Sequence, residues 1–411
     1  MTTSVKPYKA RAARCDYRAS VDEIYRVLAS ITSPLDRSWR RIEQADRVVV
    51  KLNMMKLPHN IVYMHGHRRE LVDDGVCRAV LRLLRERTKA EIIVTDTNSY
   101  TDEHLMGVDF NYAGILKDFG VQMVDSNAPP FRTYEVPGGG EMFDRYTLSA
   151  CLEGAEVVSV AKMKNHKFMG ITLCSKNLFG LPPISPPAGR ARSYFHHIIR
   201  LPYVLADLAM IADPCLNIVD GLIGQKGREW GGEGRICNTL IAGDQVTATD
   251  ACVTHLMGHD PAADWPVAPF RRDRNHLLVA AQRGYGTVDL SEIDFGSEVS
   301  PPLADFDCLQ TDSTELVDSW RRTTCEQALV YRETQKQLVE QFRDEFIFLQ
   351  QGKVVWHGPD PSFLESRRVL SGGNKEQALY LKLADPQEKE RENFPVYERN
   401  IAALRDTPEN I

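Results

Sequence analysis

The 411-residue sequence lacks any uninterrupted run of about 18 apolar residues, the length that a membrane-spanning helix needs. We therefore expect no membrane partner. The opening residues also lack the apolar stretch of a secretory signal, so we expect a cytoplasmic protein. The nine cysteines form no Cys-x-x-Cys pair, and the nearest two are Cys237 and Cys252. This spacing excludes a local zinc-ribbon or ferredoxin-type motif, and we expect reduced thiols and no iron–sulfur cluster.

Three motifs of common enzyme classes are also missing. The sequence contains no Gly-x-x-x-x-Gly-Lys-Ser/Thr segment, no Gly-x-Gly-x-x-Gly after its first apolar run and no Gly-x-Ser-x-Gly. These absences exclude the Walker phosphate loop, the dinucleotide fingerprint and the hydrolase nucleophile elbow. The net charge of −6 argues against a nucleic-acid partner, because nucleic acids attract basic proteins. A local cluster of cations would instead suit a small anionic ligand.

What the sequence does contain is a series of apolar runs that each end in a polar residue. These runs cover residues 48–53, 92–96, 121–125, 157–164, 216–220 and 239–244. Near-continuous apolar strands are typical of parallel sheets that are covered on both faces. Helical patterns lie between the runs, at residues 71–88, 112–119, 203–211 and 246–257. The alternation predicts an α/β fold with a doubly wound, mostly parallel sheet and helices on both faces.

The pattern changes after about residue 300. We predict an α/β core domain over residues 1–300 and a C-terminal helical and hairpin extension over residues 301–411. Residues 315–346 are charged and have a helical pattern. Residues 346–356 are typical of a β-hairpin that turns at Gln351-Gly352.

The apolar run that begins at Val157 carries the clearest functional signal. It ends in a group of cationic residues, Lys162, Lys164, His166 and Lys167. Ligands of open α/β sheets bind just beyond the carboxyl ends of strands, so titratable groups in this position predict a binding site. A solvated basic loop is the alternative interpretation, because lysines usually lie in water.

We predict that Lys164 and His166 are the catalytic acid/base groups. A lysine that is desolvated among other cations loses basicity, and histidine changes charge near neutral pH. The two residues are two positions apart, so their side chains would point the same way in a strand. The predicted substrate-binding residues are Lys51, Asn53, Lys162, Lys176 and Asn177.

Carboxylates near His166 would create a site for a divalent metal, which is a possible cofactor of this protein. The candidate metal ligands are Asp220, at the end of an apolar run, Asp250, in a helical pattern, and His166. Alternatively, Asp220 forms a turn and Asp250 is a surface or capping residue.

Parallel strands end at one edge of a sheet, so polar residues from several runs should converge there. These residues are Asn53, Asp96, Lys164, His166 and Asp220, with Asp244 as a further candidate.

Two irregular segments are candidates to cover this site. Residues 181–192 are too rich in proline for a helix or a central strand, and residues 222–235 contain five glycines. We expect the second segment to be a mobile loop over the site, although a plain connection is the alternative. Residues that follow the first segment form another set that could close over a ligand, namely Tyr194, His196, His197 and Arg200.

The order of these motifs resembles the family catalogued as domain of unknown function number 362, over about residues 40 to 290. The matching segments are Lys51-Leu52-Asn53, Thr95-Asp96-Thr97, Lys162-Met163-Lys164-Asn165-His166, Lys176-Asn177-Leu178-Phe179-Gly180, Asp220-Gly221, Gly231-Gly232-Glu233-Gly234 and Ala248-Thr249-Asp250-Ala251. Leu52 replaces the proline that is usual in this family. Many of its members resemble ferredoxins in one cysteine cluster, which this sequence lacks, so electron transfer through a built-in cluster is not implied.

These observations together predict an enzyme that acts on a small anionic metabolite bearing a carboxylate or a phosphate. The expected reaction is proton transfer or isomerisation, with a divalent metal as an optional cofactor. Two alternatives stay open, a redox enzyme that uses an external cofactor and a non-catalytic accessory protein that binds a ligand or a metal.

Overall fold

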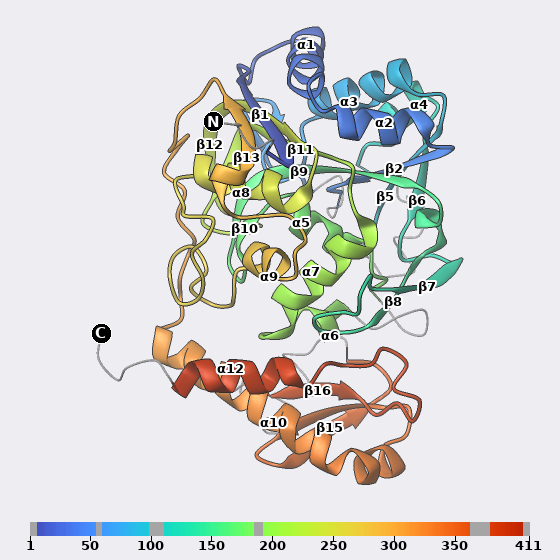
Figure 1. Cartoon of the computed structure of the whole chain (residues 1–411), viewed down its shortest axis with the longest axis vertical. Coiled ribbons are helices and arrows are strands. Elements are labelled where there is room, and N and C mark those ends of the chain that lie inside the picture. The colour runs from blue at the N-terminus through green and yellow to red at the C-terminus, as the bar shows by residue number, and fades with distance from the viewer. Residues whose placement is uncertain (1–5, 55–59, 98–110, 185–191, 362–378, 406–411) are drawn as a thin grey trace.

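A nine-stranded sheet runs through the larger part of the molecule (Figure 1). The computed structural model describes residues 6–54, 60–97, 111–184, 192–361 and 379–405. In spatial order the strands are β13 (Ile293–Ser297), β1 (Tyr8–Arg14), β12 (Glu233–Gly243), β11 (Leu216–Lys226), β9 (Glu156–His166), β2 (Arg47–Leu52), β5 (Glu91–Asp96) and β6 (Gln122–Asp125). The short strand β10 (Gly170–Thr172) pairs with β9. The strands from β11 to β6 are mutually parallel, which confirms the mostly parallel sheet.

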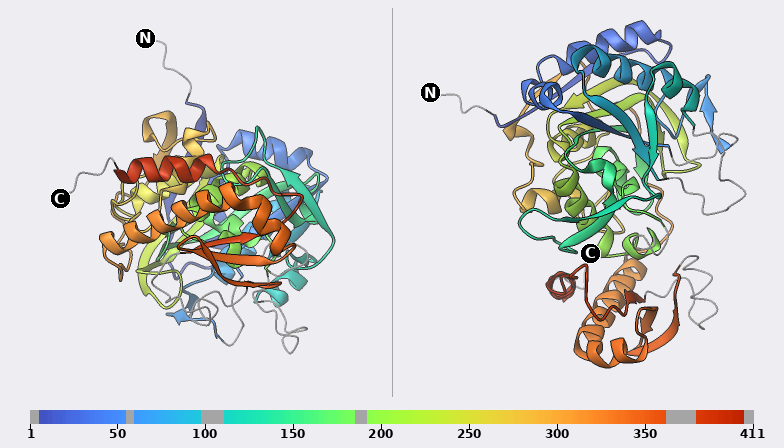
Figure 2. Two further views of the ribbon diagram at one scale, coloured as in Figure 1. Left: turned by 90° about the horizontal axis from the view of Figure 1, so that it is seen from below. Right: turned by 90° about the vertical axis from the view of Figure 1, so that its right-hand side faces the viewer.

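Helices cover both faces of this sheet because successive strand residues point to opposite sides. Val48 and Val50 of β2 pack with one layer of helices, whereas Val49 packs with the other. The first layer contains α1 (Val21–Thr32), α2 (Asp36–Gln44), α3 (Asp74–Arg87) and α4 (Ala113–Asp118). The second contains α5 (Cys174–Asn177), α7 (Arg200–Ala212), α8 (Val246–Leu256) and α9 (His276–Gln282). Figure 2 shows the two layers on either side of the sheet, as a doubly wound α/β fold requires.

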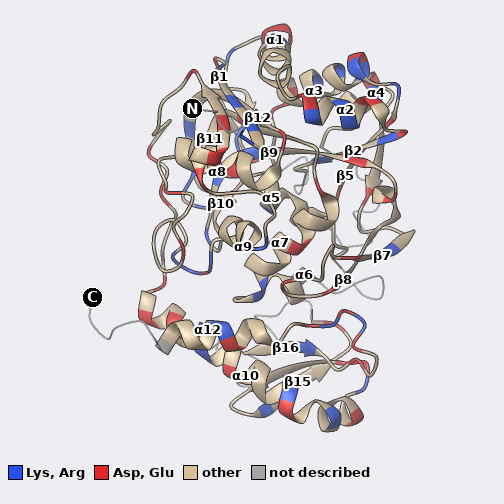
Figure 3. Ribbon diagram, viewed as in Figure 1, with Lys and Arg blue, Asp and Glu red and all other residues tan. Residues whose placement is uncertain are grey.

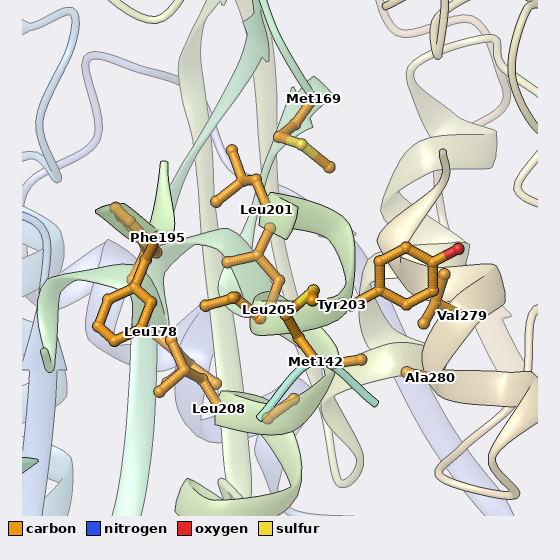
Figure 4. Close-up of a cluster of buried hydrophobic side chains, with 14 of the residues drawn as sticks. Met142, Met169, Leu178, Phe195, Leu201, Tyr203, Leu205, Leu208, Val279 and Ala280 are labelled. Atoms are coloured by element: carbon orange, nitrogen blue, oxygen red, sulfur yellow. The ribbon is translucent and has the colours of Figure 1, made fainter. Parts of the chain in front are cut away.

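The helix α7 is apolar around almost its whole circumference and is buried accordingly. Leu201, Leu205 and Leu208 of this helix pack with neighbouring apolar side chains from several segments (Figure 4). Those neighbours include Met142, Met169, Leu178, Phe195, Val279 and Ala280. The cluster fixes the position of α7 and of the segments just before it in the chain.

One predicted strand runs in the opposite direction to the expected one. Strand β12 pairs antiparallel with β11, and Gly243 lies opposite Asn217 at the start of β11. Asp244 therefore lies at the amino end of the parallel strands, and the prediction that it joins the site is wrong. The physical reason is the connection, since residues 227–232 form a tight turn with no crossover helix. The segment 222–235 is thus mostly strand and turn, not the mobile loop that its glycines suggested.

In the part of the chain after residue 300, the described residues form a three-stranded antiparallel sheet and two helices (Figure 1). The elements are α10 (Thr314–Gln341), β14 (Phe346–Gln350), β15 (Lys353–Gly358), β16 (Tyr380–Leu383) and α12 (Pro395–Arg405). The predicted hairpin is confirmed as β14–β15, with positive φ angles of 49° at Gln351 and 70° at Gly352, as a tight hairpin turn needs. Side chains of β14 share a hydrophobic cluster with α7, and the division near residue 300 stays a prediction.

The remaining elements are short. They are β3 (Tyr63–Met64), β4 (His67–Arg68), β7 (Phe131–Glu135), β8 (Arg145–Ser149), α6 (Arg192–Phe195) and the 3-10 helices at Ala150–Leu152, Leu178–Gly180 and Leu290–Glu292. Among the described helices, none combines the length and the apolar character that crossing a membrane requires.

A buried ionic network joins the C-terminal elements to α7. Glu392 accepts hydrogen bonds from Arg200 at 2.8 Å and from Lys382 at 2.8 Å, and all three side chains are at most 3% exposed. Burial by itself opposes ionisation of Glu392, but the Arg200 guanidinium and the Lys382 ammonium outweigh it and hold its pKa at about 2. The carboxylate therefore stays charged over the whole neutral range.

We expect this network to stabilise the fold in a way that depends on pH. The pKa of Glu392 lies about 2 units below that of an ordinary glutamate, which corresponds to about 3 kcal/mol of stability at neutral pH. This contribution is complete above about pH 5 and disappears as the pH falls toward 2. Urea unfolding should show that Glu392→Gln is destabilising at pH 7 and that this effect shrinks steadily as the pH falls to 2. The matched control is Glu398→Gln, whose half-exposed pair with Arg332 should contribute under about 1 kcal/mol.

Candidate functional site

A small pocket of about 160 Å³ opens at the carboxyl ends of β2, β5 and β9. Its lining residues are Lys51, Asn53, Asp96, Lys164, His166, Thr172, Lys176, Asn177, Gly180, His196, Glu229 and Trp230. The chain runs outward from β2 to β5 and β6, and then returns to β9 on the other side of β2. The pocket therefore lies where the strand order reverses, the position at which open α/β sheets bind ligands.

The structure brings most of the predicted site residues to this pocket. Those that line it are Lys51, Asn53, Asp96, Lys164, His166, Lys176 and Asn177. Three others lie elsewhere, namely Lys162, Asp220 and Asp250. Each of these three residues forms part of the framework around the pocket.

The floor of the pocket is an ion pair at the ends of β2 and β5. The Lys51 ammonium lies 2.8 Å from Oδ1 of Asp96 and donates to Oδ1 of Asn177 at 3.1 Å. Asn177 in turn donates through Nδ2 to the backbone oxygen of Lys51 at 2.8 Å. Gly180 leaves room for this pair, since a Cβ atom there would lie 2.0 Å from Asp96 Oδ1 and 2.7 Å from Lys51 Nζ. Lys51 is 1% exposed, so these contacts fix the position of its ammonium group and the protein shields it from bulk water.

Lys164 forms one wall and is also almost completely buried, at 1% exposure. Its ammonium donates to the backbone oxygen of Glu70 at 2.8 Å and lies 4.3 Å from the centre of the Trp230 ring. Gly231, beside Trp230 in the β11–β12 turn, donates its N–H to the Glu70 carboxylate. Glu70 thus holds both the lysine and the turn that carries the aromatic ring.

His166 lies two residues further along β9 and has one assignable tautomer. Its Nδ1 accepts the backbone N–H groups of Phe168 at 3.0 Å and of Met169 at 3.2 Å. A nitrogen that accepts two N–H groups carries no proton, so the ring proton of the neutral histidine is on Nε2. Nε2 lies 3.8 Å from Oε1 of Glu229. His166 therefore presents a hydrogen-bond donor on the side where Glu229 lies.

The opposite wall contains residues from β10, α5 and the segment before α7. The ring of His196 lies 5.9 Å from His166 and 5.5 Å from Phe179, measured between centroids. The Lys176 ammonium lies 4.5 Å from the centre of the Phe179 ring. Within the described part of the chain, the buried hydroxyl of Thr172 has no hydrogen-bond partner. This wall offers a cation and a hydroxyl to a ligand.

Lys162, predicted to bind the anion, is instead part of a buried ion pair behind the pocket. Its ammonium donates to Oδ2 of Asp220 at 2.9 Å, and both side chains are 0% exposed. Asp220 also accepts the backbone N–H of Asp73, the N-cap of α3, at 2.7 Å. The prediction failed because strand register places Asp220 of β11 directly opposite Lys162 of β9. Burial raises the pKa of Asp220, although Lys162 opposes this shift.

Asp250 lies inside α8 and organises the start of α5. Its carboxylate accepts the backbone N–H groups of Cys174 at 3.0 Å and of Ser175 at 2.7 Å. Burial raises its pKa to about 7. Asp250 therefore positions Lys176 and Asn177 through the backbone of α5 and has the capping role that the alternative interpretation gave it.

The predicted metal site is not assembled from its three proposed ligands. Asp220 is paired with Lys162, Asp250 caps α5, and neither lines the pocket that contains His166. Across the residues that the structure describes, no group of three or more His, Cys, Asp or Glu side chains is arranged to hold a metal ion. We correct that prediction, since the carboxylates that seemed available along the sequence already have protein partners.

Four lining residues were not predicted as site residues with assigned roles: Thr172, Gly180, Glu229 and Trp230. Glu229 and Trp230 lie in the glycine-rich segment that was expected to cover the site. The sequence therefore predicted the position of this segment correctly but not its conformation. His196 was in the set expected to close over a ligand. Its neighbour Arg200 instead binds Glu392. Thr172 has no sequence signal, because a single threonine in a three-residue strand has no distinctive pattern.

Comparison with known proteins extends this description. Thylakoid-associated protein sll1697 from Synechocystis sp. is 23% identical over 244 residues, which covers 57% of this chain and 70% of that protein. The lactate racemase apoprotein from Thermoanaerobacterium thermosaccharolyticum superposes with a TM-score of 0.35 at 13% identity, and the match covers 53% of this chain and 52% of the racemase. The family model described as Domain of unknown function (DUF362) matches residues 48–255, which include the pocket residues from β2, β5 and β9. The resemblance found in the sequence is thereby confirmed, and the chain belongs to this family.

Proposed function

We propose that the chain is an enzyme that binds a small carboxylate- or phosphate-bearing metabolite in this pocket and transfers a proton on it. One observation carries the proposal, the meeting of Lys51, Lys164 and Lys176 in one small pocket at the reversal of strand order. Each of these lysines is at most 7% exposed. Hydrogen bonds from a cationic donor to a carboxylate or phosphate oxygen are strong in a desolvated site, so three lysines around one small pocket suit an anionic ligand.

In the proposed complex the anion lies between Lys176 and Thr172. Lys176 supplies a charge-assisted hydrogen bond, which is about twice as strong as a neutral one in a desolvated site. The Thr172 hydroxyl supplies a second donor, which supports this placement because a buried hydroxyl without a partner is costly. Lys51 stays bound to Asp96 and contributes positive potential from the floor.

Lys164 and His166 divide the chemistry in this proposal. His166 donates from Nε2 to the substrate oxygen on which negative charge develops, so it stabilises that charge and does not abstract a proton. Lys164 lies beside it on β9 and carries the proton to and from the substrate carbon. Its side chain lines the pocket and is shielded from bulk water, which supports a role as proton carrier to a bound substrate. This division refines the prediction that both residues act as acid and base.

The direct test is proton exchange with solvent. The full chain is incubated in D₂O with a panel of small 2-hydroxy, 2-oxo and 2-amino acids and their phosphorylated counterparts, and mass spectrometry follows deuterium at the α-carbon. We expect enzyme-dependent exchange for at least one compound of the panel. Turnover of a panel compound with a change in its oxidation state and without deuterium incorporation would favour the redox alternative. Binding with no exchange and no turnover would favour the accessory-protein alternative.

Anion binding can be tested separately from turnover. Lys176→Met should weaken binding of an exchanging panel compound by roughly 10-fold or more, because one charge-assisted hydrogen bond is lost. Added salt should weaken binding less than it would at an exposed site, since the lysine is buried. The control is Lys353→Met, the same change at an exposed residue of the distant hairpin β14–β15. Equal affinities of the two variants would show that Lys176 does not hold the anion.

A further inference from the structure

A second pocket lies between the core and the C-terminal elements, away from the site described above. Its volume is about 380 Å³, within the range of about 300–1,000 Å³ that small-molecule sites occupy. The walls come from α7 and α9 on one side and from α10 and α12 on the other. Figure 1 shows these two pairs of helices stacked across the junction.

Arginine dominates the lining of this pocket. The charged lining residues are Arg274, Arg283, Arg321, Arg399, Glu141 and Asp264, so four guanidinium groups face two carboxylates. Figure 3 shows basic and acidic positions close together along α10 and α12. Each guanidinium has five N–H donors in a planar fork, and a carboxylate can accept from only some of them. Asp273 pairs with Arg321 from outside the lining, so among the described residues four guanidinium groups meet three carboxylates and one positive charge is in excess.

Glu141 illustrates how the carboxylates are shared. Its Oε1 lies 3.3 Å from Arg283 and its Oε2 lies 3.1 Å from Arg399, so one carboxylate serves two guanidinium groups. Among the arginines that the structure describes, only Arg274 pairs with Asp264, at 2.8 Å. Arg283 and Arg399 are 31% and 57% exposed, which leaves both accessible to a ligand that enters from solvent.

The deepest arginine has a donor that the described protein groups do not satisfy. Arg321 is 2% exposed, forms an ion pair with Asp273 and donates to Asn400 of α12 at 2.8 Å. Its guanidinium lies 4.5 Å from the centre of the Trp265 ring. Among the described residues of this lining, the buried polar atoms without a partner are Nε of Arg321 and Nε1 of Trp265. Both are donors, so the group that would complete the pocket is an acceptor.

We propose that this arginine-lined pocket binds a ligand that carries a phosphate or diphosphate group. Guanidinium groups match phosphate oxygens in a bidentate manner, and a phosphate offers more acceptor oxygens and more charge than a single carboxylate. Arg274, Arg283 and Arg399 surround the anion, and Arg321 adds positive potential from the depth of the pocket. The ligand contacts the core and the C-terminal elements together and stabilises their junction.

Pyrophosphate is the probe, titrated into the full chain by calorimetry and by thermal unfolding. We expect binding and a raised midpoint of unfolding, since a ligand that binds the folded state stabilises it. Arg399→Gln, and then Arg283→Gln together with Arg399→Gln, should weaken this binding by about 10-fold or more. Pyrophosphate that bound instead in the pocket at the strand ends would be weakened by Lys176→Met and not by the arginine variants, and this outcome would overturn the assignment to the arginine-lined pocket. The control with the same charge change is Arg78→Gln together with Arg343→Gln, at a partly exposed and an exposed position outside this lining.

The proposal has clear contrary outcomes. Absence of pyrophosphate binding, or binding that is the same in the double variant and in the control, would overturn it. Equal or tighter binding of succinate would overturn the assignment to phosphate. Circular dichroism of the free variants checks that they fold, and Arg399→Lys provides a milder change that keeps the charge and loses the bidentate geometry. An intermediate affinity for this variant would support the proposed contacts.

Discussion

Lys164→Met should lower the rate of α-proton exchange by roughly 100-fold or more, the usual contribution of a general base. Methionine has nearly the same length as lysine but cannot carry a proton, so the wall of the pocket is kept and the proposed proton carrier is lost. The rate of deuterium incorporation into a panel compound in D₂O, followed by mass spectrometry, measures the effect. Binding of the same compound should change much less than its exchange rate.

The matched control is Lys167→Met. Lys167 lies three residues further along the chain, and its side chain does not line the pocket. Exchange should be nearly unchanged in this variant. If Lys164→Met and Lys167→Met had the same modest effect, local positive potential and not proton transfer would explain the role of Lys164.

The role of His166 as a donor can be tested in the same assay. Glutamine can place an amide N–H near the position of Nε2, whereas alanine removes the donor altogether. We therefore expect His166→Gln to retain part of the exchange activity and His166→Ala to lose it. If His166 were the base, both variants would be equally inactive. The hydrogen bonds from Phe168 and Met169 to Nδ1 predict the first outcome.

Asp220→Asn should destabilise the fold by about 3–5 kcal/mol, because it leaves the buried Lys162 ammonium without its counter-ion. The double variant Lys162→Met with Asp220→Asn should recover part of this loss, since no unpaired charge is left. Urea unfolding at neutral pH measures both effects. The control is Asp22→Asn, which breaks the exposed pair with Arg82 and should cost under about 1 kcal/mol.

The single variant Lys162→Met should make stability depend more strongly on pH than it does in the wild type. Burial raises the pKa of Asp220, and removal of Lys162 takes away the opposing effect. The folded state would then bind more protons than the unfolded state above about pH 4, so stability falls as the pH rises toward neutral. A variant with the same pH profile as the wild type would show that Asp220 is not held by this pair.

The sequence alone was sufficient to locate the strands that carry the candidate site. Strands covered on both faces need near-continuous apolar residues, and this requirement is visible in β2, β5 and β9 without any structure. A polar residue that follows such a run marks the sheet edge, which is why Lys51, Asp96 and Lys164 were correctly placed together. The hairpin at Gln351-Gly352 was also predictable, because the turn depends on its own two residues.

Only the tertiary structure decided which charged residues are available to a ligand. Lys162 and Lys164 are indistinguishable along the sequence, yet register with β11 pairs the first with Asp220 and leaves the second at the pocket. In the same way, Asp250 is occupied by the backbone of α5, and β12 carries Asp244 to the opposite edge of the sheet. Local periodicity depends on neighbouring residues, whereas strand direction, register and the partner of a buried charge depend on segments far apart in the chain.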